Sequence, residues 1–454
     1  MRVPFAIQAY QSRSLPVSAQ QVLNLYAEKT PADAMAPIVL MGVPGLPLFS
    51  GLGAGPSRNG ADFNGALYVV SGSDLYKIIA SGSASVVGTV ASTGTVYMEA
   101  NADQLGILVG ATLYIWNDVT LTTVTDVDYP GWGSFCFLDG YFIGTIPGGD
   151  TFSISDLNNG LAHDALDIAS AEGSPDHLVR AFKDHRELWL FGERSTEIWY
   201  NSGAADFPFA RVDGGFIEKG IGAAKGVTKT DNSVFWLGDD RIIYRADGFR
   251  PMRISTHAIE KIITEMATIS DCVAFSYVQD GHSFVVFTFV TEGRTVVFDA
   301  ATGLWHERSS FGLGYWRPAW HVAIFGKLFV GDSVNGNVYT LDLEHRYDNL
   351  MPIVWRATSA PLDGGGKKIT MPTLEISLET GVGVTTGQGS DPLVRLSWSD
   401  DGGRTFTSDR FGSMGAIGEY RKRVRFQRLG SFRNRVYSLS GSEPVKSVVI
   451  GIAQ

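Results

Sequence analysis

The chain has 454 residues, which is long enough for a full hydrophobic core and for two or three domains. With 53 glycines, 11% aromatic and only 19% charged residues, its composition favours many short strands joined by tight turns over helices or disorder. The formal net charge of −10 argues against a general nucleic-acid-binding protein, which is normally basic over a whole face. It still allows a conduit that touches DNA without holding it.

Cysteine usage and hydropathy limit the chemistry further. The two cysteines, Cys136 and Cys272, stand among apolar neighbours, so we expect small buried side chains and neither a disulfide framework nor an all-cysteine metal cluster. No stretch approaches 18 uninterrupted apolar residues, and the N-terminus lacks the apolar core of a secretory signal. We therefore expect a cytoplasmic product that does not insert into a membrane by itself.

Residues 1–60 differ from the rest of the chain because they lack any hairpin rhythm. Two segments carry their apolar residues, 18–28 and 42–49, and the prolines of the second favour an extended path. We expect an extended N-terminal arm that packs on another domain or on a neighbouring subunit.

Residues 61–345 repeat one pattern: an apolar strand, a glycine-bearing turn, and a second strand that carries an aromatic residue. These aromatic residues are 38 to 54 positions apart, and they are Tyr76, Tyr114, Phe152, Trp199, Tyr244, Phe298 and Tyr339. A strand repeat of this length is typical of propeller blades, because a ring of blades buries faces that a single blade leaves open. The pattern predicts six or seven blades. One helix interrupts it at 255–266, where Ile259, Ile262, Ile263 and Met266 share a face.

Residues 346–454 form a separate β-sandwich-like unit. Its expected strands are 373–378, 394–398, 421–426, 435–439 and 445–450, with a flexible loop at 381–390. The predicted fold is thus all-β: a six- or seven-bladed propeller, a C-terminal sandwich and the N-terminal arm.

An arginine-rich segment lies near the C-terminus. Between Arg421 and Arg435 there are seven cationic side chains and no acidic one. Arg421, Arg423 and Arg425 have strand spacing, so they should project from one sheet face, where guanidinium groups can bind carboxylates or phosphates bidentately. A solvated edge strand, protected from aggregation by its charge, explains the same pattern.

The sharpest short motif resembles the Asp-box of sialidases and related propellers. The match falls on Ser399, Asp401, Gly403, Thr405 and Phe406. We interpret it as a structural hairpin turn in which the aspartate accepts backbone N–H groups and the aromatic ring plugs the core. Sialidases carry several such boxes, whereas this chain has one. Their upstream Phe/Tyr-Arg-Ile/Leu-Pro signature is also missing, since Phe249-Arg-Pro251 lacks the apolar residue between arginine and proline.

No other constellation points to catalysis. The eight histidines are scattered without metal-ligand spacing, and there is no nucleophile elbow or phosphate loop. The adjacent pairs Asp239-Asp240 and Asp400-Asp401 should point to opposite faces and so form no acid–base couple. We therefore predict no catalytic residue, no cofactor and no metal ion.

A family resemblance runs through the chain in order. The segments 418–426, 428–430 and 432–436, with Trp398-Ser-Asp-Asp-Gly402 upstream, look like the C-terminal signature of the packaged-DNA stabilisation proteins, or tail hubs, of short-tailed bacteriophages. Asn24-Leu-Tyr26 and Gly42-Val-Pro-Gly-Leu46 suit that family's N-terminal arm. Its central region is resembled by 195–200, 217–221 and 258–263.

The resemblance implies a structural protein of the virion tail, assembled in the bacterial host cytoplasm. Such a protein forms a ring, expected to hold six copies, below the portal and its adaptor ring. It continues the DNA channel with only transient DNA contact, helps to retain packaged DNA, and docks tail spikes or fibres and a needle or plug. In that context the expected assembly interface comprises Arg421, Arg423, Arg425, Arg428, Arg433 and Arg435. The alternatives are a sialidase-like propeller glycosidase and a glycan-binding tail fibre protein.

Overall fold

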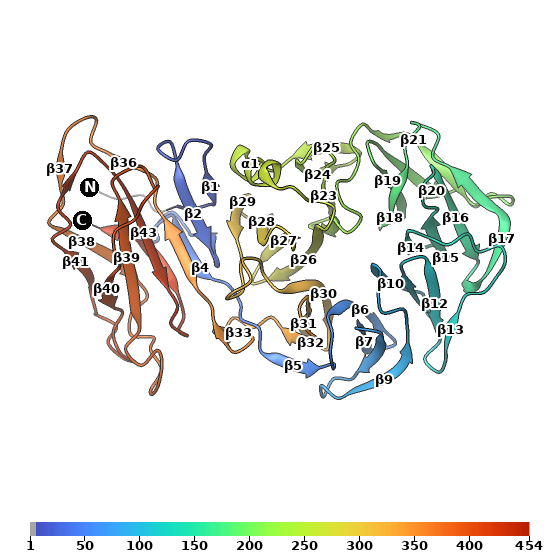
Figure 1. The fold of residues 1–454 in the computed structure, drawn as a ribbon, viewed down its shortest axis with the longest axis horizontal. Helices are drawn as coiled ribbons and strands as arrows, with labels where there is room; N and C mark the ends of the chain where they lie inside the picture. Colours follow the sequence, from blue (N-terminus) through green and yellow to red (C-terminus); the bar gives the residue numbers. More distant parts are fainter. Residues whose placement is uncertain (1–5, 454) are drawn as a thin grey trace.

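The computed structural model describes residues 6–453, and its largest part is a ring of seven four-stranded antiparallel blades. Figure 1 looks down on this ring, with the innermost strands around its centre. Six blades are separate sheets, while the sixth blade continues into a larger sheet of 11 strands. The propeller therefore has seven blades, where the repeat spacing allowed six or seven.

Each blade runs in chain order from its inner to its outer strand, except that the last takes its outer strand from the N-terminal region. The first three blades are β6–β9 (Ser57–Phe63, Ala66–Ser71, Asp74–Ile78, Ala84–Thr89), β10–β13 (Val96–Ala100, Leu105–Val109, Thr112–Trp116, Leu121–Thr123) and β14–β17 (Ser134–Leu138, Tyr141–Thr145, Thr151–Asp156, Asn159–Ser170). The next two are β18–β21 (Leu178–Asp184, Glu187–Gly192, Thr196–Asn201, Phe209–Ile217) and β22–β25 (Val227–Thr230, Ser233–Leu237, Ile243–Asp247, Arg250–Arg253). The last two are β26–β29 (Val273–Gln279, His282–Phe289, Arg294–Asp299, Leu304–Glu307) and β30–β32 with β5 (Pro318–Ile324, Lys327–Asp332, Asn337–Thr340, Leu48–Gly51).

The ring closes through a strand from the other end of the propeller sequence. Strand β5 pairs with β32 in the seventh blade, with Ser50 opposite Val338. The inner strands β30 and β6 then pack side by side across the closure. This arrangement joins the first and last parts of the propeller without a covalent link and leaves no open ring edge.

The predicted hairpins are the middle strands of the blades. Each of the seven aromatic residues that set the repeat lies on the third strand of its blade, from Tyr76 on β8 to Tyr339 on β32. The hydrophobic clusters lie between adjacent blades, as in the cluster that joins Leu67 of the first blade to Phe329 of the seventh. The repeat therefore records one supersecondary unit, which stacking of neighbours completes.

Some glycines serve packing inside strands and not turns. A Cβ on Gly144 would lie 2.0 Å from the indole of Trp132, and one on Gly331 would lie 2.2 Å from the indole of Trp320. Both tryptophans are buried. Part of the high glycine content thus lets large rings lie flat against a neighbouring strand.

Helix α1 (His257–Glu265) is the only α-helix in the described part of the chain, and it falls within the predicted range. The Thr256 hydroxyl caps it by accepting from the amide of Ile259. Ile259 and Ile263 are fully buried against the fifth and sixth blades.

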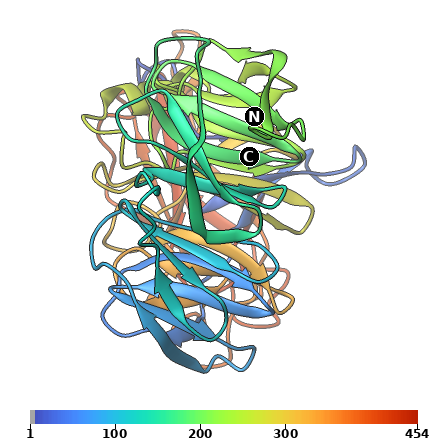
Figure 2. The same ribbon diagram turned by 90° about the vertical axis from the view of Figure 1, so that its right-hand side faces the viewer.

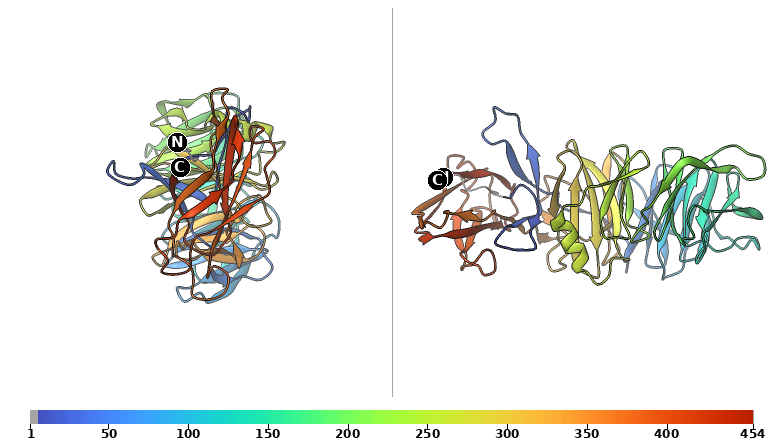
Figure 3. Two further views of the ribbon diagram at one scale, coloured as in Figure 1. Left: turned by 90° about the vertical axis from the view of Figure 1, so that its left-hand side faces the viewer. Right: turned by 90° about the horizontal axis from the view of Figure 1, so that it is seen from above.

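The second unit is a sandwich of two sheets around one hydrophobic cluster. Figure 3 shows its two layers beside the propeller, and in Figure 2 the sandwich lies behind the propeller. Sheet I contains β1 (Tyr10–Gln11), β2 (Ala19–Leu23), β35 (Trp355–Thr358), β36 (Leu362–Asp363), β43 (Asn434–Gly441), β39 (Leu393–Ser399) and β40 (Arg410–Ser413). Sheet II contains β3 (Leu25–Lys29), β4 (Ile38–Gly42), β44 (Val448–Ala453), β38 (Thr373–Leu378) and β41 (Val424–Gln427). Two short pairs complete the unit and its linker, β33–β34 (Tyr347–Asp348, Met351–Pro352) and β37–β42 (Ile369–Thr370, Ser431–Phe432).

The expectation of an extended N-terminal arm over residues 1–60 is corrected for residues 6–60, although the expected packing on the C-terminal domain is found; residues 1–5 lie outside the described part. Strands β2, β3 and β4 are built into both sandwich sheets, while β5 and β6 belong to propeller blades. Strand β2 also pairs in parallel with β29, through Leu23 and Glu307, which makes the sixth blade and sheet I one continuous sheet. The expected extended path is right only for the short links, because the apolar residues between them need partners that lie far away in sequence.

None of the helices in residues 6–453 has the length and apolar character needed to cross a membrane.

Candidate assembly surface and domain joint

The arginine-rich segment forms an edge of sheet II at the end of the sandwich far from the propeller (Figure 1). Strand β41 begins at Val424 and not at Arg421, and its ladder partner is β38. Val424 and Phe426 are buried while Arg423 and Arg425 are exposed, as the alternation predicts. We call this region, with the loops on either side of β41, the arginine edge (residues 417–433).

Two arginines of the edge are held within the chain. The Nε atoms of Arg423 and Arg425 donate to Glu375 on β38, at 2.8 and 2.7 Å. The carboxylate of Glu375 raises the pKa of Arg423 above its usual value. The single carboxylate of Glu375 neutralises one of the two positive charges and holds both side chains against the sheet, so these two arginines mainly protect the strand edge.

The other three arginines remain available. Arg421, Arg428 and Arg433 are exposed, and none of them has an ion-pair partner among the described residues. Large apolar side chains stand on the same edge and on neighbouring β40: Tyr420 is 71% exposed and Phe411 63%. Exposed arginine beside exposed aromatic rings is the composition of protein–protein contact surfaces.

Arg435 does not belong to the arginine edge, which corrects the sequence-based assignment. Its side chain is 2% exposed and bonds bidentately to Asp400, with Nε to Oδ1 at 2.5 Å and Nη2 to Oδ2 at 2.7 Å. Its guanidinium also lies 4.2 Å from the ring centre of Phe432. Arg435 therefore anchors the loop after β39 and cannot contact a partner.

The Asp-box-like turn connects β39 to β40. Asp401 accepts from the hydroxyls of Ser399 and Thr405, both at 2.6 Å, and from the Thr405 amide. These bonds hold the pKa of the Asp401 carboxyl well below its usual range. Gly403 has φ +94°, a conformation that favours glycine. The turn is structural as predicted in its bonding, but Phe406 is 42% exposed and does not plug the core.

Beside this turn, the outer face of sheet I is hollowed into a polar trough of about 300 Å³. Its lining includes Arg356 and Arg395, which flank Ser440 across three paired strands. Neither arginine has an ion pair among residues 6–453. No local sequence pattern predicts this trough, because its three strands, β35, β39 and β43, are far apart in the chain and meet only in the folded sheet.

A second cluster lies where propeller, linker and sandwich meet, and we call it the domain joint (Asn24, Pro44, Arg308, Ser310, Arg317, Asp332 and Asp348). At its centre Asn24 separates β2 from β3 with φ +53°. Its amide donates to the carbonyls of Ser309 and Val354, at 3.0 and 2.8 Å, and its oxygen accepts from the Ser309 amide. The buried side chain of Asn24 thus ties the end of the sixth blade to the residue that precedes β35 of the sandwich.

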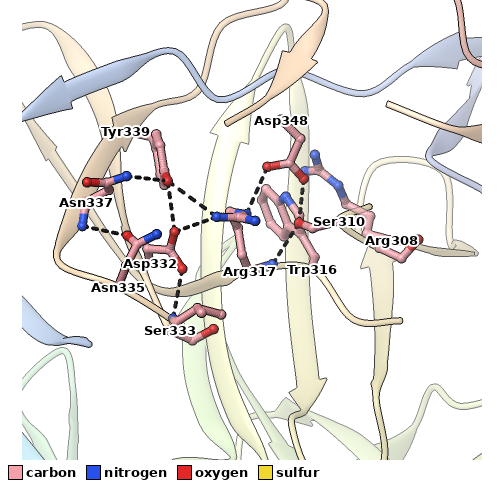
Figure 4. Close-up of polar contacts among 12 residues, drawn as sticks. Arg308, Ser310, Trp316, Arg317, Asp332, Ser333, Asn335, Asn337, Tyr339 and Asp348 are labelled. Carbon is pink, nitrogen blue, oxygen red and sulfur yellow. Dashed lines mark hydrogen bonds and ion pairs between the residues drawn. The ribbon is translucent and has the colours of Figure 1, made fainter. Parts of the chain in front are cut away.

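Buried charges continue the joint (Figure 4). Arg317 donates to Asp332 at 2.6 Å and lies 3.3 Å from Asp348, the linker residue on β33. Arg308 is 2% exposed, donates to the Pro44 carbonyl at 3.0 Å, and stacks 3.4 Å from the ring centre of Trp316. Burial raises the pKa of Asp348, and Ser310, Arg317 and Arg308 oppose that rise. These buried contacts join the linker residue Asp348 to the end of the sixth blade and the start of the seventh.

The joint explains two of the motifs on which the family resemblance rests. Asn24-Leu-Tyr26 supplies the corner residue, and Tyr26 packs edge-on against Phe284 of the sixth blade. In Gly42-Val-Pro-Gly-Leu46, the carbonyl of Pro44 binds Arg308, and a Cβ on Gly45 would lie 2.3 Å from the His345 carbonyl oxygen. The sequence alone shows these motifs but not the contacts that they make, since their partners lie more than 250 positions away.

The adjacent aspartates and the possible metal ligands can be followed in the part of the chain that the structure describes. No cluster of three or more histidine, cysteine, aspartate or glutamate residues there could hold a metal ion. The adjacent aspartates act separately: Asp400 binds Arg435, while Asp401 closes the Asp-box-like turn.

Comparison with known proteins shows what the chain is similar to. The model of the family "Bacteriophage P22 Gp10, beta-propeller" matches residues 1–346, and that of "Bacteriophage P22 Gp10, beta-sandwich" matches residues 355–452. No curated protein matches the chain. Solved structures with a similar arrangement include the Neurospora crassa Pan2 WD40 domain, at 9% identity and TM-score 0.45 over 66% of this chain and 96% of that one. BamB from Moraxella catarrhalis has 10% identity and TM-score 0.40 over 75% of this chain and 97% of that one.

Both family models thus match, in order, the two units that the structure shows. The match confirms the resemblance read from the motifs and the all-β fold of propeller and sandwich. The chain belongs to the bacteriophage P22 Gp10 family and is a structural protein of the phage tail.

Proposed function

We propose that the protein is the subunit of a tail hub, a closed ring that attaches below the portal and adaptor. We expect this ring to hold six copies. The observation that carries this proposal is the match of both family models over nearly the whole chain. The ring continues the DNA channel, helps to retain packaged DNA, and offers docking surface for spikes or fibres and a needle or plug. A net charge of −10 suits a channel along which DNA slides without binding.

In this proposal the sandwich makes the contacts and the propeller is a rigid body attached to it. The arginine edge offers three exposed arginines that have no ion pair in the described part of the chain, and exposed aromatic rings, at the end of the molecule far from the propeller. A guanidinium held at a sheet edge recognises carboxylates on a neighbouring subunit or an adaptor protein. The domain joint transmits that attachment to the blades, because it fixes the propeller relative to the sandwich.

The test mixes the purified protein with the portal–adaptor assembly of its phage and looks for an added ring by electron microscopy. The variant Arg421→Ser/Arg428→Ser/Arg433→Ser should bind at least tenfold more weakly, because it removes three exposed cations of the edge. The matched control Arg194→Ser/Arg250→Ser/Lys327→Ser removes the same charge from exposed propeller positions and should bind like the unchanged protein.

Two outcomes contradict the proposal. If the unchanged protein adds no mass to the portal–adaptor assembly and instead hydrolyses or binds glycans, a propeller glycosidase or a tail fibre protein is the better description. If both triple variants bind equally well, the hub proposal survives but the arginine edge is not its interface.

A further inference from the structure

The centre of the propeller ring holds two cations that have no acidic partner within residues 6–453. Arg180 lies on β18 and is only 8% exposed. Its guanidinium stacks 4.2 Å from the ring centre of Tyr97, its Nη1 donates to the Phe135 carbonyl at 3.2 Å, and its Nε has no partner. Lys225 lies just before β22, and its Nζ is 3.4 Å from the Arg58 carbonyl oxygen and 5.7 Å from the ring centre of Tyr97.

A neighbouring cation on β18 differs from these two, because it has an acidic partner. Lys183, three residues further along β18, pairs with Glu99 at 2.7 Å. Arg180 and Lys225 have no ion pair among residues 6–453, although burial makes an uncompensated cation costly. Burial, and after it the like charges of Arg180 and Arg58, lowers the pKa of Lys225 to about 7.

The cations border space that could hold a ligand. One cavity of about 310 Å³ is lined by both of them and by the polar side chains of Asn59, Ser276 and His321, whose Nε2 also lacks a partner. A second cavity of about 310 Å³ continues past Lys225, and the two also share Val273 and Ala319. Its acidic wall residue, Asp271, accepts from the Thr291 amide and makes no ion pair with Lys225.

We propose that this axial cavity binds a small oxyanion of the phosphate class between Lys225 and Arg180. A dianion there supplies the missing negative charge to both side chains at once and gives the free Nε of Arg180 an acceptor. The site lies inside the propeller and away from the arginine edge, so it is independent of the hub proposal.

The test is a titration of the full-length protein with inorganic phosphate, followed by isothermal calorimetry and by the shift in melting temperature. We expect saturable binding that the variants Lys225→Met and Arg180→Met weaken at least tenfold. The control Lys368→Met removes an exposed lysine of the sandwich and should leave the affinity unchanged. Acetate, a monoanion, should bind at least tenfold more weakly than phosphate, because it cannot satisfy both cations.

Loss of binding must be separated from loss of folding. Without anion, Lys225→Met should melt no lower than the unchanged protein, because it relieves repulsion from Arg180 and Arg58. Absence of saturable phosphate binding overturns the proposal. An equal effect of Lys225→Met and Lys368→Met on phosphate affinity also overturns it.

Discussion

The domain joint and the arginine edge use the same residue type under opposite conditions. At the joint, Arg308 and Arg317 are buried, and their charges meet Asp332, Asp348 and a backbone carbonyl. At the edge, three arginines are exposed and unpaired among the described residues. The contrast teaches that arginine content alone does not mark an interface. An arginine stabilises the fold where the chain itself supplies the carboxylate, and it is free to bind a partner where the chain supplies none.

The largest effect is expected from Arg317→Met, which leaves Asp332 and Asp348 buried without their shared cation. Breaking a buried pair in this way should lower the free energy of unfolding by about 3–5 kcal/mol. Chemical denaturation measures this loss. Adding Asp332→Asn to the variant should restore part of the stability, since one uncompensated charge is then removed. A loss below 1 kcal/mol would show that water reaches the joint.

The next effect is expected from Asn24→Ala, which removes three buried hydrogen bonds and keeps a positive φ. The expected loss is about 2–5 kcal/mol, of which roughly 1–2 comes from the left-handed backbone. Asn64→Ala is the matched control, because Asn64 has φ +49° but an exposed side chain. Equal losses in the two variants would mean that Asn24 contributes only its backbone conformation.

A third prediction concerns acid. His306 lies next to the joint, and burial together with the nearby Arg308 charge lowers its pKa to about 3. Its unfolded pKa is about 6.5, so the unfolded state binds the proton first, and stability falls as the pH drops below 6.5. The loss should approach about 1.4 kcal/mol per pH unit for this group. In His306→Leu, the curve of stability against pH should be shallower by that amount between pH 6 and 4, and parallel to the original above pH 7.

The smallest effect is expected at the edge. Arg423→Ala and Arg425→Ala each leave the other arginine on Glu375, and both side chains are largely solvated. Neither substitution should change the free energy of unfolding measurably, because exposed ion pairs contribute little. Urea denaturation at low and high salt measures this. A loss as large as that of Arg317→Met would erase the distinction between joint and edge.

The blades could be predicted from the sequence because each is local: its hairpins join neighbouring strands through short turns, and the aromatic residue on the third strand recurs. The alternation at Val424–Phe426 also placed the exposed arginines correctly. The N-terminal strands β3 and β4 pair with each other locally, but their place in the sandwich could not be predicted. It depends on β2 pairing with β29 and β35 and on β4 pairing with β44, which lie hundreds of residues away. Arg435 was misjudged for the same reason: its burial depends on Asp400, which only the folded sandwich brings beside it.

The pairing of β4 with β44 has a consequence for how the protein is made. Leu40 faces Val449 across that ladder, about 400 residues later in synthesis. At about 5–20 residues per second, the first sandwich strands wait roughly 20–80 seconds for the last one to leave the ribosome. A prematurely terminated chain lacks the central strand of sheet II, even if its propeller is complete. Such a fragment cannot present a finished sandwich, so incomplete translation products are kept out of any assembly that uses it.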